Sequence, residues 1–151
     1  MRSHTIAGRV LRGRRAFTLL ELTTVLAVVT LLLLLAWPRL GRARDRAKVH
    51  GAAGELGALF SLARGAAIAR RSVVAIAFDT SAGLVEVRSG PTVLARRSLA
   101  MAYGIAMRAN RDSIMYDPRG IGYGVANVTV TILRGEFVDT LTMSRMGRVR
   151  W

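Results

Sequence analysis

The residues that could do chemistry in this chain lie at the edge of its most apolar stretch. A small residue, Ala16, follows a pair of arginines and precedes Phe17, and the apolar stretch carries one acid, Glu21. Leader peptidases cut after small residues. A cut between Ala16 and Phe17 would remove a basic leader, residues 1–16, and would create a new amine four residues before the Glu21 carboxylate.

The apolar stretch has the length of a membrane span. It runs for 21 residues from Phe17 to Trp37 and contains no charge besides Glu21. As an α-helix it would extend about 31 Å, which matches a hydrocarbon core of about 30 Å. Leucines at 31–35 place apolar side chains on every face, whereas a soluble helix keeps a polar face. No small-residue cleavage site follows the stretch, so we predict a retained transmembrane helix over residues 17–38.

The segment 14–21, RRAFTLLE, resembles the class III leader of type IV prepilins and type II secretion pseudopilins. The resemblance implies that a prepilin peptidase/methyltransferase cuts before Phe17 and methylates its amine. The family usually has glycine before the cut, and this chain has Ala16. The resemblance further implies a single-pass protein in inner-membrane lipid of a bacterium, with the head in the periplasm. Charge does not set this orientation, because basic residues flank both ends of the helix.

Two roles are open for Glu21. It lies about 6 Å along the helix from Phe17, where the positive end of the helix dipole favours a carboxylate at the membrane interface. The resemblance implies a sharper role in subunit assembly, in which Glu21 pairs with the Phe17 amine of a neighbouring subunit. An unpaired charge in an apolar filament core would be costly, so this second role is the one we favour.

Residues 39–71 are predicted to continue as an amphipathic helical stem. Several glycines weaken this helix by up to about 1 kcal/mol each relative to alanine, and Gly51 to Gly57 is where a break would occur. Apolar residues recur at spacings of three and four, which is the helical period. The expected buried stripe comprises Leu40, Ala43, Ala47, Ala52, Leu56, Leu59, Phe60, Ala63 and Ala67.

Residues 72–151 change to the period of β-strands and are predicted to form a globular head. Turn residues separate the runs, as in the Asp79–Gly83 segment and in Arg134-Gly135-Glu136. The fold class is therefore α+β, a long N-terminal helix packed on the antiparallel sheets of a pilin-like head. The expected strands are Val73–Phe78, Leu84–Arg88, Thr92–Arg96, Ile114–Tyr116, Val128–Leu133, Phe137–Ser144 and Gly147–Trp151.

The C-terminal half carries a second resemblance. The turn 114–120, IMYDPRG, two following strands and the closing Gly147-Arg148 are similar to the GspH/FimT group of minor pseudopilins. The resemblance implies a non-enzymatic subunit of a type II secretion pseudopilus, with other major and minor pseudopilins as partners. An alternative is a FimT-like minor pilin of a type IV pilus that contacts DNA. A further alternative is an uncleaved single-pass membrane protein with a binding head.

The DNA alternative depends on the basic C-terminus. Arginines can bind phosphates and an aromatic ring can stack on bases, although we favour a solvated tail. The formal charge is +14; without the five leader arginines, 18 of the 23 basic residues remain against 9 acidic ones. The candidate nucleic-acid contacts are Arg145, Arg148, Arg150 and Trp151.

Other chemistry has little support in the sequence. The chain has no cysteine, which excludes disulfides and thiolate metal sites. His50 is expected to be a solvated helix residue and Asp45 a poor ligand partner for it. The segment 120–124, GIGYG, lacks the spacing of a phosphate-binding loop and is interpreted as a flexible loop. We therefore expect no catalytic residue, no metal site and no cofactor.

Overall fold

The computed structural model describes residues 17–123, 127–144, 146 and 148–150, and the chain divides into two units, Met1–Arg39 and Leu40–Trp151. Helix α1 (Leu19–Arg70) begins in the first unit and continues into the second. Its start is capped by Thr18, whose hydroxyl oxygen accepts a hydrogen bond from the Glu21 backbone N–H at 3.2 Å. Such a cap satisfies one of the backbone donors that a helix start leaves free.

The first unit presents its apolar side chains outward. All described side chains from Phe17 to Trp37 are exposed, and the most apolar 18-residue window of α1 has a mean hydropathy of 2.5. The hydroxyls of Thr23 and Thr24 both donate to the Leu20 carbonyl, and that of Thr30 donates to Leu26, each at 2.8 Å. The backbone of the helix therefore accepts the hydrogen bonds of these threonine hydroxyls. Polar groups of a helix in lipid need such partners, because no water is present there. By length and composition, this part of α1 could cross a membrane.

The part of α1 in the second unit does not break at its glycines. Ala52, Ala53 and Leu56 are fully buried between Gly51 and Gly57, so packing against the head offsets the low helix propensity of glycine. The helix ends at Arg70, and Arg71 takes a left-handed φ of 49°. The predicted stripe was wrong at its beginning: Leu40, Ala43 and Ala47 are exposed, because the buried contact with the head begins at Val49.

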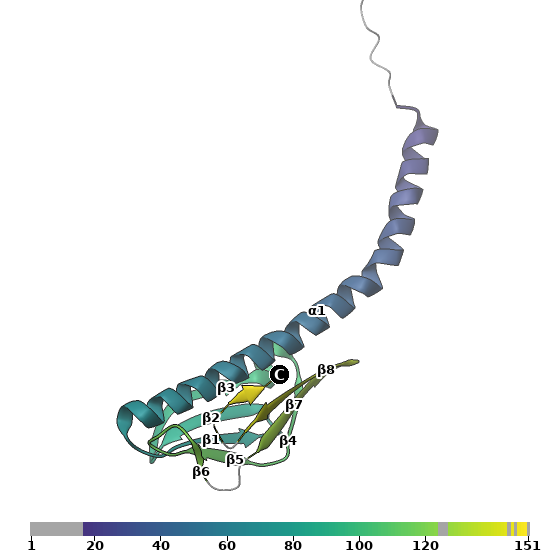
Figure 1. Cartoon of the computed structure of the whole chain (residues 1–151). Helices are drawn as coiled ribbons and strands as arrows, with labels where there is room; N and C mark the ends of the chain where they lie inside the picture. The colour runs from purple at the N-terminus through teal and green to yellow at the C-terminus, as the bar shows by residue number, and fades with distance from the viewer. Residues whose placement is uncertain (1–16, 124–126, 145, 147, 151) are drawn as a thin grey trace, which may run out of the picture. The chain divides into compact units, whose positions relative to one another are not determined.

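Two antiparallel sheets form the head (Figure 1). Sheet A has the order β3-β2-β1-β5-β6 and sheet B the order β4-β7-β8-β9. Six of the seven expected strands are confirmed within about two residues at each end. The seventh is confirmed at β9, and its two ends, Gly147 and Trp151, lie outside the described residues. Sheet A comprises β1 (Val74–Asp79), β2 (Leu84–Ser89), β3 (Thr92–Ser98), β5 (Ser113–Tyr116) and β6 (Gly122–Tyr123). Sheet B comprises β4 (Ala106–Ala109), β7 (Val128–Arg134), β8 (Phe137–Met143) and β9 (Val149–Arg150).

Three elements were not expected. Helix α2 (Leu99–Tyr103) is capped by the Ser98 hydroxyl, and strands β4 and β6 each complete a sheet. β6 lies inside the glycine-rich segment, so the interpretation of 120–124 as a flexible loop was wrong at Gly122–Tyr123. These residues pair with β5 through Tyr116↔Gly122 and Met115↔Tyr123.

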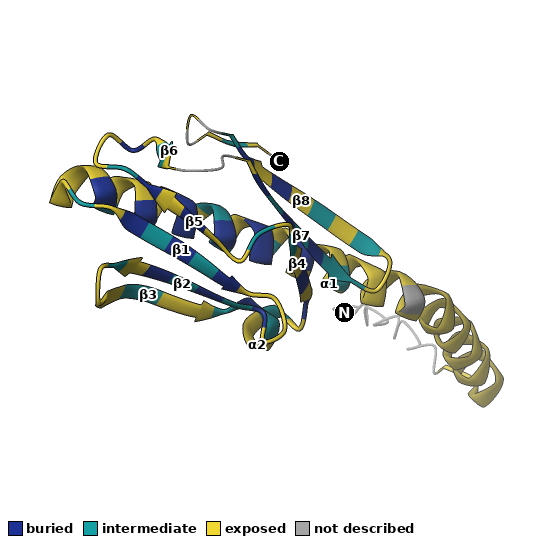
Figure 2. Cartoon of the chain, turned by 90° about the horizontal axis from the view of Figure 1, so that it is seen from below, coloured by how far each residue is buried: buried dark blue, intermediate teal, exposed yellow. Residues whose placement is uncertain are grey.

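The core lies between α1 and the inner faces of the two sheets, as the buried residues in Figure 2 show. Along β1 and β7 every second residue is buried, which is the pattern of a sheet with one face on the core. Phe60 of α1 and Phe78 of β1 meet at a centroid distance of 6.0 Å. Among the described residues, every fully buried side chain is apolar apart from the hydroxyl of Tyr116.

Candidate functional site

The start of α1 brings together two of the residues singled out from the sequence. Phe17 precedes the helix and is 73% exposed, and Glu21 lies in the first turn, also exposed. Within the described part of the chain, Glu21 has no ion-pair partner of its own. Its carboxylate is therefore available to a group outside this chain. Ala16 and the leader lie outside the described residues.

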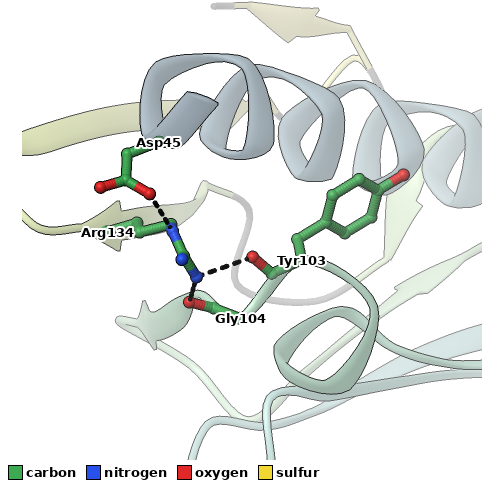
Figure 3. A network of polar contacts seen from close by, with 4 residues as sticks. All are labelled: Asp45, Tyr103, Gly104 and Arg134. Atoms are coloured by element: carbon green, nitrogen blue, oxygen red, sulfur yellow. Dashed lines mark hydrogen bonds and ion pairs between the residues drawn. The ribbon is translucent and has the colours of Figure 1, made fainter. Parts of the chain in front are cut away.

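A second polar site lies where the stem meets the head. Arg134 ends β7 and points toward α1, where its Nε donates to Oδ1 of Asp45 at 2.5 Å (Figure 3). Its Nη1 donates to the carbonyl oxygens of Tyr103 and Gly104, at 3.0 and 2.5 Å. These two carbonyls end helix α2, and a guanidinium there interacts favourably with the helix dipole. One side chain thus joins α1, α2 and β7.

Gly104 permits this contact. Its φ is +63°, a left-handed conformation that favours glycine. A Cβ at this position would lie 2.2 Å from Nη1 of Arg134, so the guanidinium could not keep its position. The Asp45–Arg134 contact thus ties the stem residue Asp45 to the head.

Tyr103 forms a second link between stem and head. Its pKa is raised, chiefly because its hydroxyl hydrogen-bonds the Glu55 carboxylate of α1. Glu55 also lies 3.4 Å from Nε of Arg97 in β3. A Cβ on Gly51 would lie 2.9 Å from the Tyr103 ring, so this glycine allows the ring to approach the helix.

The C-terminal arginines line a hollow of about 590 Å³ beside α1. Arg148 and Arg150 flank it on the β9 side and Arg64 on the helix side. None of the described residues that line it carries a carboxylate, which makes this lining attractive to an anion. The other lining residues are Gly54, Gly57, Ala58, Phe60, Ser61, Tyr116 and Val149. Arg145 and Trp151 lie outside the described residues, so the structure places two of the four candidate nucleic-acid contacts and adds Arg64.

Arg64 was missed because nothing in its sequence context distinguishes it from the other arginines of the stem. It lies 84 residues before Arg148, and only the packing of β9 beside α1 brings the two to one hollow. His50 is an exposed helix residue, as expected, with Nδ1 3.7 Å from the Asp139 carboxylate. Among the described residues, no three histidine or acidic side chains are placed to hold a metal ion.

Residues 52–147 match a protein family described as type II transport protein GspH. A search among curated proteins found no match. Two crystal structures of the Pseudomonas aeruginosa type IV minor pilin FimU have a similar fold. One has a TM-score of 0.60 at 19% identity over 70% of this chain and 89% of FimU; the other has 0.56 at 16% over 67% and 90%.

Proposed function

Because this chain belongs to the GspH family and has a pilin-like fold, we propose that it is a minor pseudopilin of a type II secretion system. In this role the protein is a structural subunit rather than an enzyme, and it assembles with other pseudopilins into a periplasmic pseudopilus. The observation that carries the proposal is the apolar, outward-facing first part of α1 joined to a head of the GspH family.

The first part of α1 is suited to two successive environments, the membrane and then the filament. Its side chains are exposed on every face, so this surface must be covered by lipid before assembly and by other helices afterwards. We propose that a prepilin peptidase removes residues 1–16 and methylates Phe17, and that Glu21 then pairs with the amine of a neighbouring subunit. The protein would be anchored in the inner membrane with its head in the periplasm.

A second candidate function is that of a minor pilin in a type IV pilus. Its support is the fold shared with FimU and the arginine-lined hollow of Arg64, Arg148 and Arg150, which suits a phosphate backbone. The two candidate functions differ in the filament subunits with which the chain assembles. They share the processing step and the helix.

The experiment is affinity purification of the tagged full-length chain from crosslinked native membranes. Mass spectrometry should show a mature N-terminus at Phe17 carrying one added methyl group. Secretion pseudopilins among the crosslinked proteins support the first candidate, and pilins of a pilus support the second. An intact N-terminus with no filament subunit in the eluate would contradict both.

A further inference from the structure

The outer face of sheet A carries an apolar patch at the end where α1 stops. Ala75 of β1 lies opposite Arg88 of β2 and Met115 of β5, and Met115 lies opposite Tyr123 of β6. We call these residues, together with Val73 just before β1, the sheet A patch; its members are Val73, Ala75, Arg88, Met115 and Tyr123. The residues that alternate with them along the strands are buried on the core side: Val74, Ile76, Ile114 and Tyr116.

The patch is exposed and hollowed. Val73 and Met115 are each 42% exposed, and Tyr123 is 65% exposed. A hollow of about 740 Å³ lies over Ala75, between Met115 and Arg88. The small Ala75 side chain leaves this space while its larger neighbours rise on both sides. Contiguous exposed apolar groups in a hollow mark an interaction surface more often than scattered ones do.

The outer face of sheet B has a different chemistry at its centre. There Thr129 lies opposite Thr142, and Thr131 opposite Thr140, so that hydroxyls cover the middle of the sheet. Hydroxyls of this kind hydrogen-bond water and need no partner. The apolar character of the sheet A patch is therefore not a general property of the outward face of this head.

Charge around the patch is positive. Arg70 and Arg71 precede Val73 in the chain, and Arg119 stands in the turn before β6. Glu86 is shared between two arginines, Arg88 at 3.3 Å and Arg96 at 3.7 Å, so one carboxylate meets two positive charges. The nearby acid Asp117 accepts backbone N–H bonds from Arg119 and Ile121. The rim thus favours a partner with acidic groups.

A second copy of the chain is a poor source of such a rim. Asp45, Glu55, Glu86 and Asp139 already face arginine or histidine, and Asp79 and Asp117 accept hydrogen bonds within their own turns. Among the described acids of residues 40–151, this leaves Asp112 and Glu136 for a contact with another copy. A nucleic acid is also a poor fit, because the patch has an apolar floor and a nucleic-acid surface makes most of its hydrogen bonds to phosphates. Tyrosine, methionine and arginine are instead the residues enriched at protein interfaces.

We propose that the sheet A patch docks an apolar, acid-rimmed surface on the head of a different filament subunit. This inference rests on the proposed function and adds to it the docking surface and the chemistry of the partner. Met115 and Tyr123 fill the apolar contact, and Arg88 pairs with an acid of the partner. Tyrosine and arginine at the centre of an interface carry much of its binding energy, and methionine is enriched at such interfaces.

The test uses the tagged full-length chain, co-expressed with the filament subunits found with it. Met115→Glu and Tyr123→Ser should each lower the amount of partner subunit that co-purifies, by about tenfold or more. Arg88→Glu should lower it and Arg88→Lys should retain most of it. Met101→Glu is the matched control, because Met101 is 89% exposed on α2 and lies outside the patch. All variants should keep the mature N-terminus, the membrane fraction and the melting temperature of the unaltered chain.

Normal co-purification of Met115→Glu and Tyr123→Ser would overturn the docking surface while leaving the proposed function intact. Equal losses for Met101→Glu would overturn it too, since the effect would not be specific to the patch. Loss of DNA retention in place of subunit retention would assign the patch to nucleic acid and refute a protein partner. If the unaltered chain retained no filament subunit, both the proposed function and this inference would be refuted.

Discussion

The ring of Tyr103 lies against the backbone of Gly51, so closely that a Cβ at Gly51 would be 2.9 Å from Cε1 of the ring. Gly54, one turn along α1, has no heavy atom within 4 Å of the same position. The two glycines belong to one helix, and only Gly51 has this contact. They therefore allow helix propensity and packing to be measured separately.

Gly51→Ala and Gly54→Ala should change stability in opposite directions. Gly54→Ala should stabilise the head by up to about 1 kcal/mol, the difference in helix propensity. Gly51→Ala gains the same propensity but displaces Tyr103 from Glu55, so we expect a net loss of about 1 kcal/mol. Urea unfolding of the unit that begins at Leu40 measures both. Equal gains for the two variants would mean that the ring moves aside freely.

Arg134→Met should destabilise the head by about 1–3 kcal/mol, because Asp45 and two carbonyls lose their donor. Asp45→Asn should cost less, since the amide oxygen still accepts the Arg134 bond. Arg97→Met is the control: Arg97 also pairs with an α1 acid but is 63% exposed, and exposed pairs contribute under about 1 kcal/mol. A loss for Arg97→Met as large as that for Arg134→Met would contradict a special role for Arg134.

Alkaline pH should unfold the head through Tyr116. Burial raises the pKa of this hydroxyl to about 12, against a smaller opposing effect of Arg64, and the hydroxyl donates to Sδ of Met143 at 2.8 Å. An unfolded tyrosine ionises near pH 10. The unfolded state therefore loses a proton that the folded state keeps, and stability present below pH 10 should fall as pH rises toward 12. The difference in pH profile between the unaltered head and Tyr116→Phe isolates this effect, and superimposable profiles would argue against it.

Processing should depend on the residue before the cut. We expect Ala16→Gly to be cleaved at least as fast as the unaltered chain and Ala16→Leu to be blocked, because a bulky side chain should not fit a peptidase site that takes glycine. The size of the membrane-extracted protein, followed after a pulse label, gives the answer. Mature-sized protein from Ala16→Leu would place the cut elsewhere.

Glu21 should matter for assembly and little for insertion. Glu21→Ala and Glu21→Leu make the helix more compatible with lipid, so cleavage and membrane fractionation should persist while incorporation into filaments falls sharply. Glu21→Gln keeps the size of the side chain and removes its charge, which separates ion pairing from packing. Recovery in sheared filaments measures the effect. Equal incorporation of all three variants would reduce Glu21 to an interfacial residue.

The sequence predicted the elements that carry a regular period. The helical spacing of the stem and the alternation of β1, β2 and β7 are properties of neighbouring residues, and the structure confirms them. β4, Ala106–Ala109, has no β-branched residue and takes its place only because it pairs with β7. β6 has two residues and α2 has five. Elements this short have too few residues to show a period.

The contacts between distant residues could not be predicted. The predicted buried stripe was wrong at Leu40, Ala43 and Ala47, because periodicity shows which face of a helix is apolar and not where the sheet that covers it begins. The partner of Arg134 and the grouping of Arg64 with Arg148 depend on the same tertiary packing. The family resemblance is confirmed, whereas the roles of Ala16, Phe17 and Glu21 stay predictions.

The contact between Asp45 and Arg134 can form only late in biosynthesis. The two residues are 89 positions apart, so Asp45 leaves the ribosome well before its partner is made. At about 5–20 residues per second, the stem spends several seconds without the strand that will hold it. Contacts of such long sequence separation form slowly. The nascent stem therefore keeps Ala52, Ala53 and Leu56 uncovered until the strands of the head have been made.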